Sequence, residues 1–267
     1  MQVYNGDKYQ GFADYMLYGG LPLITSMQTA EQKARYLTTL FQETDLKDLK
    51  ERHRIDKEIE LNKLLNVLSS SIGSLSNPNK IEAPFKTQLH SNISANTIRQ
   101  YLEYLQDAFL ISAANRYDVK GRRYIGTPLK YYFEDVGLRN ARLGFRQLEE
   151  THLMENVIYN ELKARGFCVD VGGVPIKKHS AGEKRERVQL EIDFIATLGT
   201  PNYYIQSAYA LATEDKIRQE EAPLINAPDS FRKIIVVNDT LNLRRDERGS
   251  TTINVYDLLL NEHSLEL

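Results

Sequence analysis

Residues 191–195 read Glu-Ile-Asp-Phe-Ile, and this stretch decides the fold that we expect for the second half of the chain. Acidic and apolar residues alternate in it, which predicts a β-strand over 189–197 with two different faces. Glu191 and Asp193 are two residues apart, so they are expected on one face, with the apolar side chains on the other. Polar residues at positions where a core is expected make this strand the first candidate for a functional site.

The segments around this strand predict an α/β domain. The expected elements are a helix over 148–165, strands over 167–171, 189–197 and 203–211, a helix over 213–222, a strand over 233–238, and a last strand and helix over 252–261. This order of one helix, three strands, a second helix and a strand predicts a mixed sheet flanked by helices, an α/β (α+β) fold class. We therefore expect residues 148–267 to form one domain.

Helical spacing of apolar residues dominates before residue 148. Helices are expected over 10–18, 28–51, 55–72 and 84–90, and behind Ser94, which is a suitable N-cap. In the last of these helices one buried face is expected, formed by Ile98, Tyr101, Leu102, Leu105 and Phe109.

Two strands, over 110–117 and 130–134, are expected to follow these helices and to form a hairpin with a basic tip. Helix, short helix, helix and hairpin is the order of a winged helix. We therefore expect a helical region over residues 1–147 that contains a winged-helix-like module at about 55–135.

The composition excludes several classes of protein. The 267 residues carry 34 basic and 36 acidic side chains, and this balance is not that of a polycation that coats nucleic acid. No apolar run approaches the ~18–20 residues of a membrane-spanning helix, and the first residues lack the apolar stretch of a signal peptide. A single cysteine, Cys168, excludes an internal disulfide framework and is expected to be buried. We expect a cytoplasmic protein without a membrane partner.

Three polar positions of the second half have the order found in metal-dependent nucleases of the PD-(D/E)XK superfamily. These nucleases use a helix glutamate, a strand aspartate, and an acid and a lysine two residues apart on the next strand. Here Glu155 lies in the expected helix and Asp193 in the strand, and the next strand carries Gln206 and Ala208 on one face. Glu155, Asp193 and Gln206 are therefore the candidate catalytic residues.

The chemistry of such a site shows why the departures matter. Mg²⁺ prefers oxygen ligands, of which carboxylates supply one or two, and a lysine orients a water molecule and offsets the phosphate charge. Gln206 offers only a neutral carbonyl oxygen, and Ala208 offers no donor. We expect a degenerate site in which Asp193 and Glu155 bind Mg²⁺ or Mn²⁺ weakly, with slow cleavage of DNA or none. The alternative, that these acids serve only the sheet, stays open.

A second candidate site is the basic strip, residues 116–146, which contains eight basic and three acidic residues. Lys120, Arg122 and Arg123 lie at the expected hairpin tip and are candidates for contacts with DNA phosphates. Arg99, on the exposed face of the helix behind Ser94, is a candidate for contacts with bases. The alternatives are a solvated turn or a surface for an acidic protein partner.

Seven sequence blocks, spread over nearly the whole chain, form a recognisable set. They read YMLYGGLP at 15–22, TIRQYL at 97–102, KYYFEDVGLRN at 130–140, EN at 155–156, EL at 161–162, EIDF at 191–194 and YIQ at 204–206. In combination they resemble the C-terminal part of a large prokaryotic family, the AAA or archaeal-type ATP-binding proteins of unknown function. Members of that family carry a P-loop ATPase domain, a winged-helix region and a PD-(D/E)XK nuclease-like domain.

The resemblance implies more than these residues contain, because no GxxxxGKS or GxxxxGKT sequence occurs in the chain. We expect the chain to be the C-terminal part of a longer protein, with a stand-alone relative as the alternative. ATP and Mg²⁺ are implied for the absent ATPase domain, and no cofactor is implied for this chain.

The function expected from the residues and the resemblance together is recognition of DNA or of a protein partner, one candidate being the absent ATPase domain. In this reading the nuclease-like site is non-catalytic or weakly catalytic. The alternatives are an active metal-dependent DNA nuclease and a protein–protein interaction or oligomerisation module. Whether the chain is an enzyme, and its oligomeric state, stay open at this point.

Overall fold

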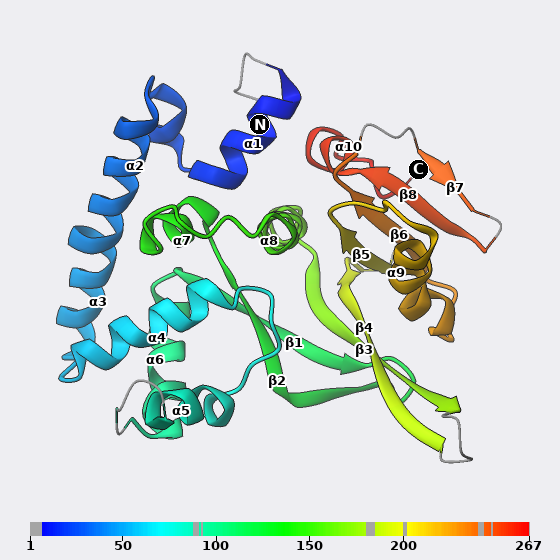
Figure 1. Ribbon diagram of the computed structural model, residues 1–267, viewed down its shortest axis with the longest axis horizontal. Helices are drawn as coiled ribbons and strands as arrows, with labels where there is room; N and C mark the ends of the chain where they lie inside the picture. Colours follow the sequence, from blue (N-terminus) through cyan, green and yellow to red (C-terminus); the bar gives the residue numbers. More distant parts are fainter. Residues whose placement is uncertain are drawn as a thin grey trace. The chain divides into compact units, whose positions relative to one another are not determined.

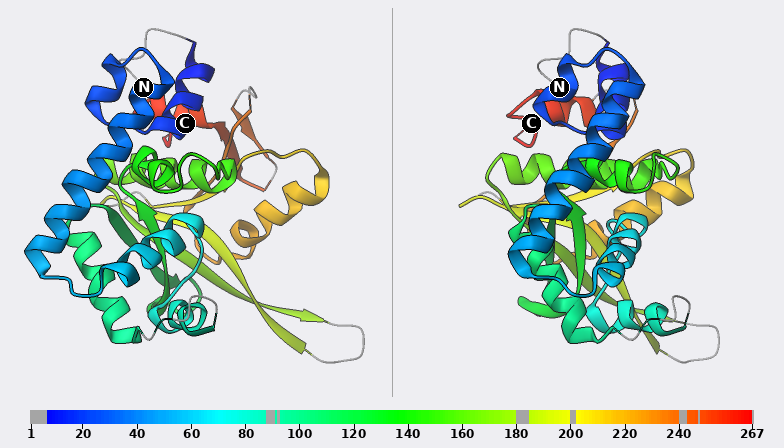
Figure 2. Two further views of the ribbon diagram at one scale, coloured as in Figure 1. Left: turned by 60° about the vertical axis from the view of Figure 1, so that its left-hand side comes forward. Right: turned by 90° about the vertical axis from the view of Figure 1, so that its left-hand side faces the viewer.

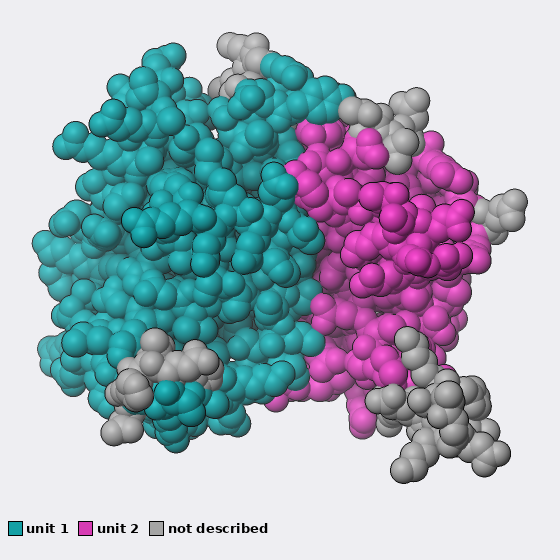
Figure 3. Space-filling view, in the orientation of Figure 1, with its two compact units in different colours: residues 1–113, 128–157 teal, residues 114–127, 158–267 magenta. Residues whose placement is uncertain are grey.

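Two units make up the chain in the computed structural model (Figure 3). The structure describes residues 7–87, 91, 93–179, 185–199, 202–239, 243–246 and 248–266. Unit 1 consists of residues 1–113 and 128–157, and unit 2 of residues 114–127 and 158–267. Their helices and strands are labelled in Figure 1.

The boundary between the two units differs from the expected domain boundary. The sequence predicts a boundary between residues 147 and 148, whereas the units divide after Val157, inside α8 (Glu150–Ala164). Segment 114–127, which contains the tip of the hairpin formed by β1 (Ile111–Asp118) and β2 (Arg123–Phe133), belongs to unit 2. The physical reason is that Val119 is fully buried in an apolar core cluster of unit 2.

Helices form most of unit 1. They are α1 (Lys8–Tyr18), the 3-10 turn η1 (Pro22–Ser26), α2 (Ala30–Thr39), the π-helical turn η2 (Leu40–Asp45), α3 (Leu46–His53), α4 (Glu58–Ser70), α5 (Pro78–Thr87), α6 (Ala95–Asp107) and α7 (Val136–Arg142). The helix expected over 28–51 is therefore one continuous helical run with a π-helical turn inside it. Residues 88–90 of the helix expected over 84–90 lie outside the described residues.

The predictions for α6 are confirmed with one exception. Ser94 caps the helix by accepting a hydrogen bond of 3.1 Å from the backbone N–H of Thr97. The expected face is buried except for Phe109, which is 78% exposed. Phe109 follows the end of the helix with a positive φ of 53°, so the chain turns there and buries Leu110 instead.

The order of helices followed by a hairpin, expected for a winged helix, is present as α4, α5, α6, β1 and β2. The hairpin strands do not stand alone, because β1 pairs in parallel with β3 (Cys168–His179). Both strands therefore belong to a larger sheet, in the order β2-β1-β3-β4-β5-β6-β8-β7.

The elements after residue 148 follow the order expected from the sequence, with one further short strand, β7. After α8 and β3 come β4 (Arg185–Thr197), β5 (Asn202–Ala208), α9 (Glu214–Asn226), β6 (Arg232–Val237), β7 (Arg244–Arg245), β8 (Ser250–Asn254) and α10 (Val255–Leu260). The central strands β3, β4 and β5 are antiparallel, whereas β5, β6 and β8 run parallel. The protein is thus of the mixed α/β class, with a large mixed sheet and flanking helices (Figure 2).

β4 contains a bulge at Asp193, where one residue of β3, Val171, faces both Asp193 and Phe194. A bulge interrupts the alternation of the two faces and re-aims the side chains beside it. Ile192 and Ile195 consequently belong to the same core cluster although they are three residues apart. The strict alternation expected for this strand therefore ends at Asp193.

Cys168 is exposed, so the expectation that it is buried is wrong. It lies at the start of β3, between Phe167 and Val169, which are both buried. Since successive side chains of a strand point to opposite faces, the thiol points away from the side that buries its neighbours.

Candidate functional site

Asp193 and Gln206 lie side by side on β4 and β5. The carboxylate of Asp193 accepts a hydrogen bond of 2.9 Å from the backbone N–H of Ser207. The backbone N–H of Asp193 in turn donates to Oε1 of Gln206 at 3.4 Å. All three residues are buried. The predicted neighbourhood of Asp193 and Gln206 is confirmed, whereas their role in catalysis stays a prediction.

Helix α9 adds two residues to this pair, Glu220 and Lys216. Nε2 of Gln206 donates a hydrogen bond of 3.0 Å to Oε2 of Glu220, and Nζ of Lys216 lies 2.5 Å from Oε1 of the same carboxylate. Both oxygens of Glu220 therefore have partners. The amide of Gln206 is hydrogen-bonded through both Oε1 and Nε2. Lys216 was not among the residues expected at this site, although its i, i+4 spacing to Glu220 on an expected helix indicates such a pair.

The position of the nuclease lysine lies in the core of unit 2. Ala208 is buried and belongs to the same apolar cluster as Leu224 and Ile235. A lysine here would place its ammonium group among apolar side chains, which is costly unless the charge is paired. Packing therefore favours a small apolar residue at this position.

Glu155, the third candidate, is a buried residue of unit 1. Nζ of Lys130 lies 2.8 Å from its Oε1, which also accepts a hydrogen bond of 2.7 Å from the hydroxyl of Tyr132. Nδ1 of His152 lies 3.9 Å from Oε2, an ion-pair distance too long for a hydrogen bond. Burial raises the pKa of Glu155, but Lys130 and the hydrogen-bond donors hold that pKa below its ordinary value. The carboxylate is therefore ionised and paired with a cation of its own unit.

The described residues contain no group of three or more His, Cys, Asp or Glu side chains that could hold a metal ion. Asp193 and Gln206 belong to unit 2 and Glu155 to unit 1, and each has partners within its own unit. Oxygen atoms of the type that Mg²⁺ prefers are present, but they already accept hydrogen bonds or pair with ammonium groups. Metal binding by Asp193 and Glu155 stays a prediction.

The basic strip over 116–146 is not a continuous surface. Lys130 and Arg139 are buried, and Nε of Arg139 donates a hydrogen bond of 2.7 Å to the backbone carbonyl of Ser69. Arg142 is partly buried and bonds through Nη1 to Asn62 at 3.0 Å. The expectation of a basic strip is wrong for these three residues, because their cations satisfy groups inside unit 1.

The tip of the hairpin, by contrast, keeps its charges at the surface. Lys120, Arg122 and Arg123 are all exposed. Nη2 of Arg122 lies 3.3 Å from a carboxylate oxygen of Asp229, so part of its charge is balanced within unit 2. Lys120 and Arg123 are therefore the stronger candidates for phosphate contacts at this tip.

Arg99 lies on the exposed face of α6, as expected, and donates a hydrogen bond of 3.0 Å to the side chain of Asn96. It belongs to unit 1, whereas the residues of the hairpin tip belong to unit 2. The four candidate contacts with nucleic acid thus come from two units.

Two of the blocks behind the family resemblance pack against each other in unit 1. The carboxylate of Asp135 accepts a hydrogen bond of 2.8 Å from the backbone N–H of Gly20. Nδ2 of Asn140 donates to the backbone carbonyls of Met16 and Leu17 at 2.8 and 2.9 Å. Burial raises the pKa of Asp135. These hydrogen bonds hold α1 to α7. They give the residues of the two blocks a structural role within unit 1.

None of the helices in the described residues is long and apolar enough to cross a membrane.

Comparison with known proteins identifies relatives that have no established function. A family model described as a domain of unknown function, DUF8612, matches residues 9–149, more than half of the chain. An uncharacterised protein of Haemophilus influenzae is 29% identical over 249 residues, which cover 93% of this chain and 58% of that protein. The uncharacterised protein MJ1544 of Methanocaldococcus jannaschii is 28% identical over 257 residues, or 95% of this chain and 53% of that protein. The chain thus spans little more than half of these relatives.

Among solved structures, the crystal structure of protein VC1899 from Vibrio cholerae is similar with a TM-score of 0.33 and 15% sequence identity. The match covers 86% of this chain and 56% of that one.

Proposed function

We propose that this chain, which belongs to the family of the DUF8612 domain of unknown function, recognises nucleic acid as part of a longer protein and does not cut it. Only 58% and 53% of the two curated relatives align with this chain. The remainder leaves room for the ATP-binding domain that the resemblance to AAA-type proteins implies. In this proposal ATP and Mg²⁺ belong to that further domain, and unit 2 is a degenerate nuclease-like domain.

The hydrogen bonding of Gln206 is the observation that carries the proposal. Its amide joins the backbone of Asp193 to the carboxylate of Glu220, and Lys216 neutralises that carboxylate. A nuclease needs open carboxylate oxygens for a hydrated metal ion and a cation directed at the phosphate. Here the carboxylates of Asp193 and Glu220 already accept hydrogen bonds, and Lys216 pairs with Glu220, so the arrangement supports a structural role without a cleavage step.

The hairpin tip supports the recognition of nucleic acid. Lys120 and Arg123 are exposed and lie three residues apart on a tight turn, and Arg122 adds a third cation beside them. Phosphate contacts from such residues release counterions and make binding dependent on salt. Because Lys130 and Arg139 of the strip are buried and Arg142 bonds within unit 1, we expect a small number of contacts and modest affinity.

A cleavage assay tests the non-catalytic part of the proposal. Wild type and Asp193→Ala are incubated with supercoiled plasmid and Mn²⁺, and we expect neither protein to nick the plasmid. Nicking by the wild type that disappears in Asp193→Ala would show an active metal-dependent nuclease instead.

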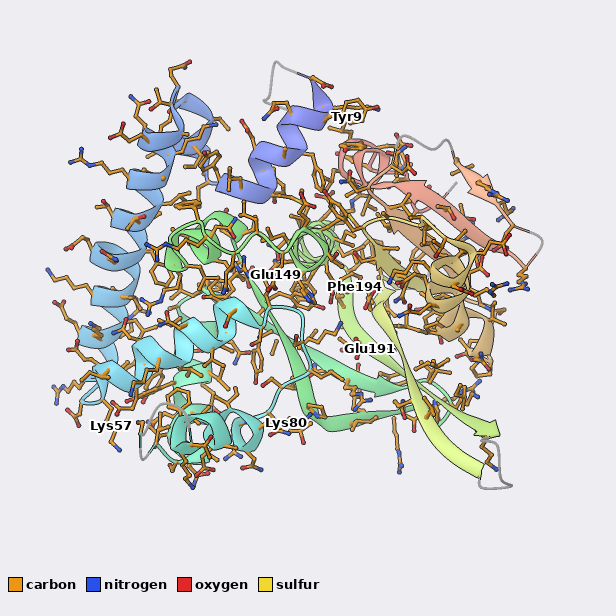
Figure 4. The ribbon with its side chains drawn as sticks, viewed as in Figure 1. Tyr9, Lys57, Lys80, Glu149, Glu191 and Phe194 are labelled. Carbon is orange, nitrogen blue, oxygen red and sulfur yellow. The ribbon has the colours of Figure 1, made fainter. Side chains whose placement is uncertain are left out.

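A binding assay tests the recognition part. Fluorescence anisotropy with labelled duplex and single-stranded DNA, starting from ~50 mM salt, compares Lys120→Ala/Arg123→Ala with the control Lys57→Ala/Lys80→Ala. The control removes the same charge from exposed lysines of unit 1 (Figure 4). We expect weaker binding and a salt slope smaller by up to about two only in the first variant. If the wild type binds neither DNA, the recognition of nucleic acid is refuted, and an interaction module becomes the better reading.

A further inference from the structure

Unit 2 contains a cavity of about 460 Å³ that the nuclease-like site does not use. Tyr117, Tyr124, Tyr204 and Phe231 bring four aromatic rings to its wall. The rings of Tyr117 and Tyr124 meet edge to face with centroids 5.4 Å apart, and those of Tyr204 and Phe231 lie 4.9 Å apart. The volume is within the range of about 300–1,000 Å³ typical of small-ligand sites, which are also rich in aromatic residues.

Two carboxylates bind two of these rings, those of Tyr124 and Tyr204, and face the same cavity. The hydroxyl of Tyr124 donates a hydrogen bond of 3.0 Å to Asp170, and that of Tyr204 donates one of 2.7 Å to Asp229. Both carboxylates line the cavity. Since an ionised carboxylate has several lone pairs, each retains the capacity to accept an N–H group from a ligand.

Among the described residues that line the cavity, one is a cation, Arg122, and it lies at the surface. Arg122 pairs with Asp229 at 3.3 Å while its side chain stays 77% exposed. Its backbone has a positive φ of 50°, in a turn where Asp118 accepts a hydrogen bond of 2.9 Å from the N–H of Gly121. Two carboxylates and one guanidinium leave the lining with a formal charge of −1, so a phosphate is disfavoured inside the cavity and favoured outside, at Arg122.

We propose that this cavity binds one nucleobase, with its ring against the tyrosines, its N–H groups toward Asp170 or Asp229, and its phosphate beside Arg122. Base stacking on aromatic side chains accepts any base, whereas a carboxylate favours a base with amino or imino donors. The inference rests on the proposed recognition of nucleic acid and adds to it an unpaired base as the part recognised. The base can come from a free nucleotide or from a single strand.

A cationic side chain of a protein is the competing occupant, because aromatic rings and carboxylates also bind ammonium and guanidinium groups. The geometry favours the base, since Arg122 already holds that place at Asp229. At Asp229 a guanidinium ligand would have to displace Arg122, whereas a neutral ring would not.

The test uses 2-aminopurine, a fluorescent base whose emission is quenched when it stacks on aromatic rings. It is offered to the whole chain as the free 5′-monophosphate, as an unpaired base in a single strand, and as a paired base in a duplex. We expect quenching by the wild type in the first two forms and not in the duplex. Quenching of the single strand alone would also support the proposal and would identify nucleic acid as the source.

Matched variants locate the effect. Tyr124→Ala removes an exposed ring of the cavity, and Tyr9→Ala removes an exposed tyrosine of unit 1 (Figure 4). Loss of one stacking contact should weaken binding of the probe about tenfold in Tyr124→Ala and leave Tyr9→Ala unchanged. Tyr124→Phe keeps the ring and should stay close to the wild type. Thermal melting confirms that each variant is folded before it is compared.

Three results would overturn the inference, and each differs from failure of the proposed function. DNA binding without quenching of 2-aminopurine would exclude the cavity and leave recognition of DNA standing. Equal affinities of Tyr124→Ala and Tyr9→Ala would do the same. Binding of free L-arginine, measured by calorimetry, with no binding of any mononucleotide would assign the cavity to a cationic side chain. Quenching by the free nucleotide with no DNA binding would instead retain the cavity and refute the proposed function.

Discussion

Nε2 of Gln206 donates a hydrogen bond of 3.0 Å to Oε2 of Glu220, and both side chains are buried in unit 2. A nuclease of the PD-(D/E)XK type would have an acid in place of Gln206. The neutral amide lets α9 approach β5 without two carboxylates facing each other, and Lys216 balances the remaining charge.

Replacing Gln206 by Glu should make the stability of the protein depend on a divalent metal ion. The variant places two carboxylates at hydrogen-bond distance, so we expect a loss of about 1–3 kcal/mol at neutral pH. Mn²⁺ should recover part of the loss by bridging the two acids. Thermal denaturation with and without Mn²⁺ measures both effects. The control Gln206→Ala should be destabilised without any response to Mn²⁺, and an equal response in both variants would contradict the prediction.

Replacing Lys130 by Met should be among the most damaging single changes in unit 1. It leaves the carboxylate of Glu155 buried without its cation, and breaking a buried pair costs about 3–5 kcal/mol. The double variant Lys130→Met/Glu155→Met should lose less, because no charge is then left unpaired. Urea denaturation measures the free energies of unfolding of the wild type, the single variant and the double variant. A double variant less stable than Lys130→Met would refute this account.

The same pair predicts the sign of a pH dependence. In the wild type the pKa of Glu155 lies below its ordinary 4.5, so its contribution to stability is present above pH 4.5 and is lost as the pH falls through the lowered value. In Lys130→Met burial should raise that pKa above 4.5, and the variant should become more stable relative to the wild type on acidification. Urea denaturation between pH 4 and pH 7 tests this. If the free energies of unfolding of the wild type and the variant changed in parallel with pH, the prediction would be contradicted.

The hydroxyl of Tyr124 should lose its proton at a higher pH than an ordinary phenol. Its hydrogen bond to Asp170, followed by the charge of that carboxylate, raises the pKa of Tyr124 from 10.0 to about 12. The stability due to this bond is therefore present below pH 10 and is lost as the pH rises through about 12. Ultraviolet titration of Asp170→Asn should show one tyrosine that ionises earlier than in the wild type, and an unchanged titration curve would contradict the assignment.

Replacing Gly137 by Ala should destabilise unit 1 although alanine is the better helix former. A Cβ atom at this position would lie 2.1 Å from the backbone carbonyl oxygen of Tyr18, which is too close for any relaxation of a side chain to relieve. We expect a loss of about 1–3 kcal/mol in thermal or urea denaturation. Gly126 is the matched control, since a Cβ there would meet nothing within 4 Å.

The sequence by itself determined the mixed α/β class and the order of the elements, apart from short ones such as β7. Apolar spacing predicted α6 and its Ser94 cap, and alternation predicted β4 and β5 with Asp193 and Gln206 as neighbours. These features depend on periodicity along the chain, which any single sequence contains. Phe109 shows the limit of apolar spacing as a guide. It fits the helical pattern of apolar residues, but it lies after the end of α6, where the backbone has already turned.

Only the tertiary structure decided which charges remain at the surface and which groups meet. Lys130 and Arg139 count as basic residues in the sequence, but they are buried against groups distant along the chain. The contact of Gln206 with Glu220, and the meeting of Tyr124 with Asp170, likewise join segments 14 and 46 residues apart. The sequence does not identify the partner of a given charge or aromatic ring, because that partner is set by how the elements pack.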